Sequence, residues 1–137
     1  MNDVSRLRLL RFVLLACVVG WAAPVLAVFW KWDSAERALE GLGARPIAYD
    51  PMLDYWLRMA SGAFTLVGVL FLLAAIYPRK YAVILPWLGW MMLAEGVVLL
   101  AHGLRLGLKP FPFYGDVAAC FLGGAAILVL RSRARPG

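Results

Sequence analysis

Four long, mostly apolar stretches decide what this chain can fold into. They cover about residues 9–30, 55–77, 82–104 and 113–130, with few charged side chains inside them. An α-helix that crosses the ~30 Å hydrocarbon core of a membrane needs about 20 predominantly apolar residues. Hydrophobic residues make up 64% of the 137-residue chain, against roughly 45–50% in soluble proteins. We therefore expect an all-α integral membrane protein, with residues 1–137 forming a single membrane domain.

The segments between these stretches predict how the helices are connected. The turn Pro78-Arg79-Lys80 is so short that the second and third helices are expected to form an antiparallel hairpin. Residues 33–54 are the only sizeable polar segment and are predicted to be an outer loop. Within it we expect a short surface helix at about 34–40, since Asp33 and Glu36 can cap its start. The result is an antiparallel bundle of four transmembrane helices.

Basic residues predict the orientation of this bundle. The tails and the 78–81 turn contain one acid, Asp3, and eight basic residues: Arg6, Arg8, Arg11, Arg79, Lys80, Arg131, Arg133 and Arg135. The opposite side contains five basic and six acidic residues, so the two sides have net charges of +7 and −1. Positively charged loops stay in the cytoplasm. We therefore expect both termini to be cytoplasmic, in a multi-pass protein of the cell inner (plasma) membrane, and we expect no nucleic-acid partner.

Several polar residues lie within the predicted helices or at their outer boundary. An ionisable side chain costs roughly 2.5–3.5 kcal/mol at the membrane centre on insertion scales. The polar residues are Asp54, Arg58, Ser61, Thr65, Glu95, His102 and Asp116. Those of the second stretch share one helical face with Gly68, which should point into the bundle. Arg58 is expected to pair with Glu95, with His102 and Asp116 nearby. The cluster is either a structural contact between helices or a ligand, ion or proton site in an outward-facing polar cavity.

Small residues recur on the last two stretches at helical spacing. Gly89, Gly96 and Gly103 follow one another every seven residues, and Gly115, Ala119 and Gly123 every four. Such stripes allow membrane helices to approach closely. They indicate packing within one chain or, alternatively, packing against a second copy or a larger partner subunit.

The sequence contains no motif for catalysis or for cofactor binding. No nucleophile–base pair, phosphate-binding loop, CxxC or HExxH motif is found, so enzymatic activity is not expected. No metal site is predicted, because His102 is the only histidine and only Glu95 and Asp116 could join it. Haem bound by His102, alone or between two copies, is not expected either. Cys17 and Cys120 lie in apolar stretches and are interpreted as small buried hydrophobes.

The second half of the chain resembles a family of small bacterial inner-membrane proteins with four helices. The resemblance covers residues 55–130 and rests on Tyr55-Trp56-Leu57-Arg58-Met59, Pro78-Arg79-Lys80-Tyr81, Glu95-Gly96, His102-Gly103-Leu104-Arg105 and Pro112-Phe113-Tyr114-Gly115-Asp116. That family has no assigned activity, so the resemblance implies a fold and no function.

Two functions are compatible with these features. The leading hypothesis is a non-enzymatic accessory or scaffold subunit of a membrane complex, with the lipid bilayer and a second copy or a larger complex as partners. The alternative is a small carrier or sensor that uses Arg58, Glu95, His102 and Asp116.

Overall fold

The computed structural model describes residues 3–131, and every regular element in this range is a helix. The helices are α1 (Asp3–Ala22), α2 (Val25–Phe29), α3 (Trp32–Gly41), α4 (Pro51–Ile76), α5 (Leu85–Leu106) and α6 (Pro110–Leu130). Four spans are long and apolar enough to cross a membrane: Asp3–Phe29, which joins α1 and α2, and the helices α4, α5 and α6. The protein is therefore a helical, multi-pass membrane protein by the length and composition of its helices. Arg133 and Arg135 of the predicted basic tail lie outside the described residues.

A break at Pro24 divides the first span into α1 and α2. Proline has no backbone N–H and clashes with the preceding helical turn, so a helix bends or ends there. The backbone continues through the break with hydrogen bonds from Ala23 N to Val19 O (3.2 Å) and from Ala27 N to Pro24 O (2.9 Å). The bend lets α2 lie against α4.

The polar loop contains the predicted surface helix, but its start is capped differently. The helix α3 begins after Lys31, which makes no side-chain cap, and Asp33 lies inside its first turn. Glu36 instead accepts a hydrogen bond from Ile47 N (Oε1, 3.2 Å) and so attaches the second half of the loop to α3. The predicted Asp33–Glu36 capping pair is therefore wrong.

Local capping sets the ends of the other helices. α4 begins four residues before the predicted position, because the Asp50 side chain accepts from the N–H groups of Met52 (2.7 Å) and Leu53 (3.0 Å) and Pro51 starts the helix. α5 ends two residues later than predicted, at a left-handed Gly107 (φ +61°), which is a common helix stop.

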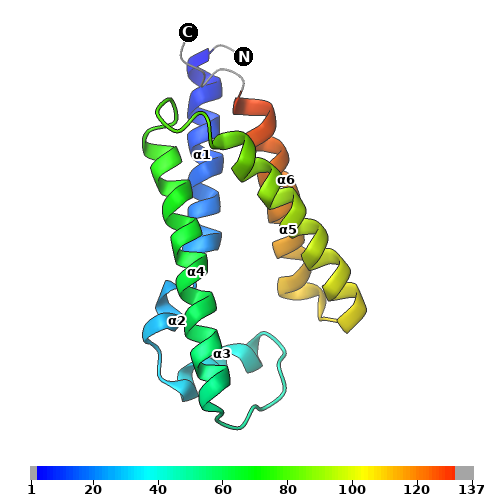
Figure 1. Cartoon of the computed structure of the whole chain (residues 1–137). Helices are drawn as coiled ribbons and strands as arrows, with labels where there is room; N and C mark the ends of the chain where they lie inside the picture. Colours follow the sequence, from blue (N-terminus) through cyan, green and yellow to red (C-terminus); the bar gives the residue numbers. More distant parts are fainter. Residues whose placement is uncertain (1–2, 132–137) are drawn as a thin grey trace.

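The helices pack as two pairs, α1 with α4 and α5 with α6, and α1 also contacts α6. In Figure 1 the first and last described residues and the 77–84 connection lie at one end, and α3 lies at the other. Away from the 77–84 connection α4 and α5 diverge, and no extended contact joins them in the part of the chain described. The expectation that these two helices are close neighbours along their length is therefore wrong, because α1 and α6 lie between them.

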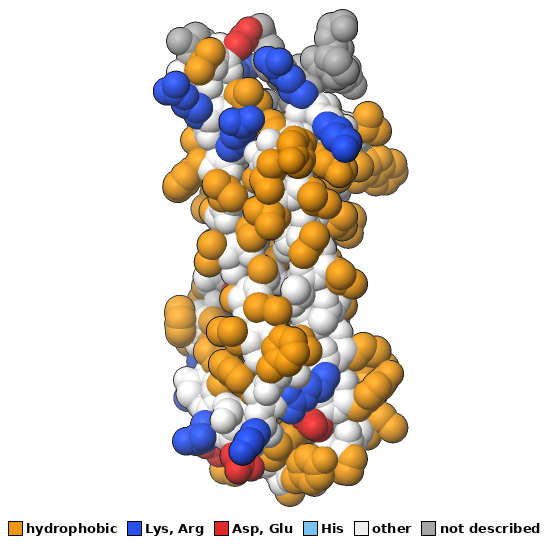
Figure 2. Space-filling view, turned by 90° about the vertical axis from the view of Figure 1, so that its left-hand side faces the viewer, with side chains coloured by type: hydrophobic (Ala, Val, Ile, Leu, Met, Phe, Trp, Pro, Cys, Tyr) orange, Lys and Arg blue, Asp and Glu red, His pale blue; other side chains and the backbone are white. Residues whose placement is uncertain are grey.

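The tightest packing is near the end that holds the termini. Leu10, Leu14, Phe71, Leu85 and Ile127 are the largest fully buried side chains. All five lie in the halves of the span Asp3–Phe29 and of α4, α5 and α6 next to the 77–84 connection. On the face shown in Figure 2, apolar side chains form a wide band and the charged ones gather at the two ends. Where the helices diverge, the packing leaves a cavity.

Candidate functional site

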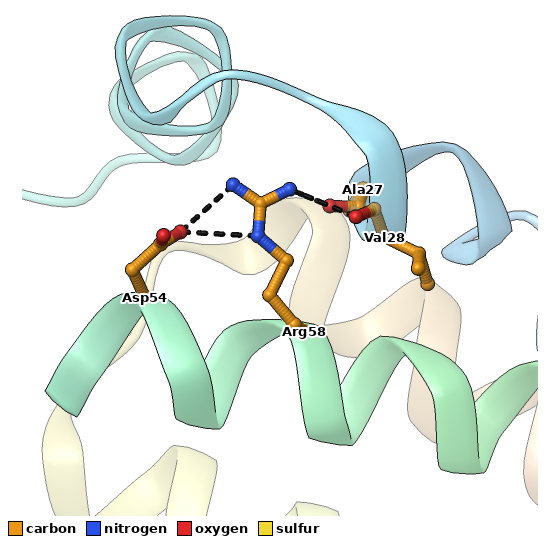
Figure 3. A network of polar contacts seen from close by, with 4 residues as sticks. All are labelled: Ala27, Val28, Asp54 and Arg58. Atoms are coloured by element: carbon orange, nitrogen blue, oxygen red, sulfur yellow. Dashed lines mark hydrogen bonds and ion pairs between the residues drawn. The ribbon is translucent and has the colours of Figure 1, made fainter. Parts of the chain in front are cut away.

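The predicted polar cluster is divided between two places, and the first is a network around Arg58. Its guanidinium donates from Nε and Nη2 to Asp54 Oδ1 (3.1 and 2.8 Å), one turn earlier on α4. Nη1 donates to the backbone carbonyls of Ala27 (2.9 Å) and Val28 (3.0 Å). Figure 3 shows Arg58 bridging from α4 to α2. The last carbonyls of a helix have no partner within it, so Arg58 completes the hydrogen bonding of α2 and fastens it to α4.

The expected ion pair between Arg58 and Glu95 is not formed. Arg58 and Asp54 make the ion pair instead, and α4 has diverged from α5 at this end of the molecule. The prediction treated helices that are consecutive in sequence as neighbours in space. The bend at Pro24 brings the α2 carbonyls within reach of Arg58, which sequence spacing alone did not indicate.

The other predicted polar residues have separate surroundings. Ser61 is buried, and its backbone carbonyl accepts a hydrogen bond from Thr65 Oγ1 (2.8 Å). Both residues lie on the inward face of α4, as the helical spacing predicts. His102 is exposed on α5 and does not line the cavity described below.

The second place is a groove of about 540 Å³, which α1, α5 and α6 form with one side chain of α4. It is lined mostly by apolar side chains, and its charged residues are Glu95 and Asp116. Phe12 and Leu122 at its border are 70% and 72% exposed. Both lie within transmembrane spans, so the groove opens sideways, towards lipid. The cavity is thus apolar and lateral, whereas the carrier or sensor hypothesis predicted an outward-facing polar one.

Glu95 and Asp116 come from adjacent helices, α5 and α6. Within residues 3–131 neither carboxylate makes a hydrogen bond or an ion pair. Arg58, the partner expected for Glu95, is bound to Asp54 and α2. The groove therefore has an excess of acidic groups with no basic side chain in its lining.

Aromatic rings form another part of the groove wall. Trp21 of α1 and Phe64 of α4 both line it and meet edge to face, with ring centroids 5.6 Å apart. Trp21 also stacks on Phe71, with centroids 6.5 Å apart, which connects this wall to the buried core. The ring faces of Trp and Phe attract cations, so carboxylates and aromatic rings of the same groove favour a positively charged occupant.

Most of the predicted small-residue positions are used within the chain. A Cβ added at Gly89 or Gly96 would contact α6, at Leu128 Cγ (2.8 Å) and Cys120 Cβ (3.2 Å) respectively. Gly103 lies against the Phe113 ring, and Gly123 against Met92 and Cys17. Gly115 differs, since nothing lies within 4 Å of an added Cβ. Ala119 is exposed and lines the groove rather than a helix contact.

The groove also contains residues that the sequence did not single out as a site. Phe12, Ala16 and Gly20 recur every four residues along α1, a spacing that could have indicated one face turned to a cavity. Cys17, Met92 and Cys120 line its deepest part, where it meets the buried core. They lie close together because of how α1, α5 and α6 pack, and this packing cannot be predicted from residue spacing in the sequence.

Comparisons of the chain with models of protein families, with curated proteins and with solved structures find no match.

Proposed function

We propose that this protein binds a lipophilic cation in the groove between α1, α5 and α6 and acts as a small carrier or sensor in the plasma membrane. The observation that supports this best is the presence of two carboxylates, Glu95 and Asp116, in an otherwise apolar groove. The carrier or sensor hypothesis from the sequence used four residues. Only Glu95 and Asp116 line the groove, because Arg58 and His102 lie elsewhere.

The chemistry of the lining matches a ligand with a positive charge on an apolar body. Attraction between opposite charges is stronger in a medium of low dielectric constant than in water. The aromatic faces of Trp21 and Phe64 add a cation–π contribution. A volume of about 540 Å³ falls within the roughly 300–1,000 Å³ typical of sites for small molecules.

The route to the groove fits a molecule that partitions into membranes. Its border residues Phe12 and Leu122 belong to transmembrane spans, so a ligand can enter from the lipid phase. We further propose that the basic end of the bundle, with Arg6, Arg79 and Arg131, faces the cytoplasm, because basic loops are retained there.

Equilibrium binding of a permanently charged probe, tetraphenylphosphonium, to the purified protein in detergent tests the proposal. We expect saturable binding that is at least ~10-fold weaker in Glu95→Gln or Asp116→Asn, a difference of about 1.4 kcal/mol. The matched control is Glu40→Gln, an exposed acid on α3 outside the groove, which should bind like the unchanged protein. Equal affinity of all four proteins, or no saturable binding, would contradict the proposal.

The accessory or scaffold role is the competing proposal, in which a second copy or a larger complex covers the apolar surface. One observation favours it: α4 and α5 diverge, so each presents a flank that no other transmembrane helix within residues 3–131 covers. The glycine stripes support it less, because Gly89, Gly96 and Gly103 already contact α6. Mass measurement of the complex in mild detergent distinguishes the two, since a strictly monomeric particle without a partner would count against a subunit role.

A further inference from the structure

Three sulfur atoms gather where the groove meets the buried core. Cys17 of α1 donates a hydrogen bond from Sγ to Met92 Sδ of α5 at 3.6 Å. Cys120 of α6 lines the same cavity, and both cysteines are free. All three side chains are buried. Each lies near the middle of its transmembrane span.

Neighbouring glycines show how close Cys120 is to the other two. A Cβ added at Gly123, one turn after Cys120, would lie 3.3 Å from Cys17 Sγ and 3.4 Å from Met92 Sδ. A Cβ added at Gly96, one turn after Met92, would lie 3.2 Å from Cys120 Cβ. Residues one turn apart on a helix are separated by about 5–6 Å at Cβ. Cys120 therefore lies on the turn of α6 next to the one that faces the Cys17–Met92 pair.

We propose that Cys17, Met92 and Cys120 form a binding site for a soft monovalent metal ion, Cu(I), in the middle of the membrane. Thiolate and thioether ligands suit soft ions such as Cu(I) and Zn²⁺, whereas Mg²⁺, Ca²⁺ and Mn²⁺ prefer oxygen ligands. Structural Zn²⁺ is almost always bound by four ligands, so a set of three sulfurs favours Cu(I). A metal–sulfur bond of about 2.3 Å places two sulfurs on one ion about 3.7–4.6 Å apart. The Cys17–Met92 separation of 3.6 Å is close to that range.

Binding replaces the thiol protons and changes no oxidation state. Each cysteine that binds as a thiolate releases one proton, and the methionine binds as a neutral thioether. Glu95 and Asp116 line the same cavity and can accept the released protons. Glu95 precedes Gly96 and Asp116 lies one turn before Cys120, so both are adjacent to the sulfur cluster.

This inference does not depend on the lipophilic-cation proposal, because its ligands are different side chains. Among the described residues, no group of three or more histidine, cysteine, aspartate or glutamate side chains could hold a metal ion. The proposed site is not such a group, because one of its three ligands is a methionine.

The test is a titration of the full chain, purified in detergent under reducing and anaerobic conditions, with Cu(I) in competition with a chromogenic Cu(I) chelator. We expect one Cu(I) per chain. Cys17→Ser and Cys120→Ser should each weaken binding by on the order of 100-fold, and Met92→Leu by about 10-fold. Met91→Leu, an exposed methionine next in sequence, is the matched control and should bind like the unchanged protein.

X-ray absorption of the Cu(I)-loaded, unchanged protein gives a result that does not rely on any variant folding correctly. We expect a shell of three sulfur neighbours at about 2.3 Å, which falls to two in Met92→Leu. A shell of nitrogen or oxygen neighbours would overturn the proposal, as would a stoichiometry and affinity that Cys17→Ser and Cys120→Ser leave unchanged. Weak tetraphenylphosphonium binding together with tight Cu(I) binding would reject the lipophilic-cation site alone.

Discussion

At the scale of single residues, Arg58 shows how a basic side chain can be accommodated near a membrane boundary. Two guanidinium nitrogens donate to the carboxylate of Asp54, and the third donates to the carbonyls of Ala27 and Val28. Those carbonyls close the helix α2, whose end carries partial negative charge. A lysine has a single ammonium group and cannot reproduce this planar geometry. Arg58 therefore acts as a fastening between α4 and α2.

Replacing Arg58 with methionine should lower the free energy of unfolding. The variant leaves Asp54 and the Ala27 and Val28 carbonyls without their donor, and hydrogen bonds to charged groups contribute about 1.5–3 kcal/mol. We expect a loss of that size for Arg58→Met and a smaller one for Arg58→Lys, measured by denaturant titration in detergent micelles. Arg105→Met, at an exposed position of α5, is the control with a change below about 0.5 kcal/mol. Equal losses in Arg58→Met and Arg105→Met would refute the fastening role.

The polar residues could be found from the sequence, but their partners could not. Charged residues inside apolar stretches are visible directly, and so are Asp54 and Arg58 one turn apart. The contact from Arg58 to α2 depends on the bend at Pro24, whose direction the sequence does not specify. Glu95 and Asp116 are brought to one groove by the contact of α5 with α6. Their separation from Arg58 follows because α4 packs on α1, not on α5.

At the scale of helices, the apolar stretches located all four spans, and the ends differed by a few residues. Two of these differences arise from capping. Asp50 and Pro51 extend α4 beyond its apolar part, and Gly107 lets α5 continue past the predicted end. Capping residues lie in the polar segments that flank the helices. A prediction based on the length of apolar stretches does not take these segments into account. The existence of the helices is thus more predictable than their ends.

Close contact between α1 and α4 depends on Gly68. An added Cβ there would lie 2.9 Å from the backbone nitrogen of Ala22. Backbone cannot move aside as a flexible side chain can, and overpacking typically costs about 1–3 kcal/mol. We expect Gly68→Ala to lose that much stability in a denaturant titration. The control is Gly62→Ala on the same helix, where nothing lies within 4 Å of the added atom. Alanine has a higher helix propensity than glycine, so Gly62→Ala should keep or gain stability. A loss in Gly62→Ala as large as that in Gly68→Ala would contradict the role of the α1 contact.

At the scale of the whole molecule, packing is uneven along the spans. Fully buried side chains lie near the end with the termini, and the groove occupies the part where the helices diverge. A well-packed end can hold the four helices in register while the other end leaves room for a ligand. The sequence predicted the helical class and could not predict this unevenness, because it results from the order α4–α1–α6–α5 across the bundle.

The proposed orientation rests on the unequal charge of the two ends, and single-cysteine labelling in intact cells tests it. A membrane-impermeant maleimide should label Gly41→Cys, at the α3 end. It should label Arg8→Cys and Lys80→Cys, at the basic end, only after the membrane is permeabilised. These three positions are exposed, whereas Cys17 and Cys120 are buried, so the unchanged protein should remain unlabelled. The reverse pattern would invert the orientation. Labelling of Arg8→Cys without Lys80→Cys in intact cells would place the two on opposite sides, so that α1 and α4 could not both cross the membrane.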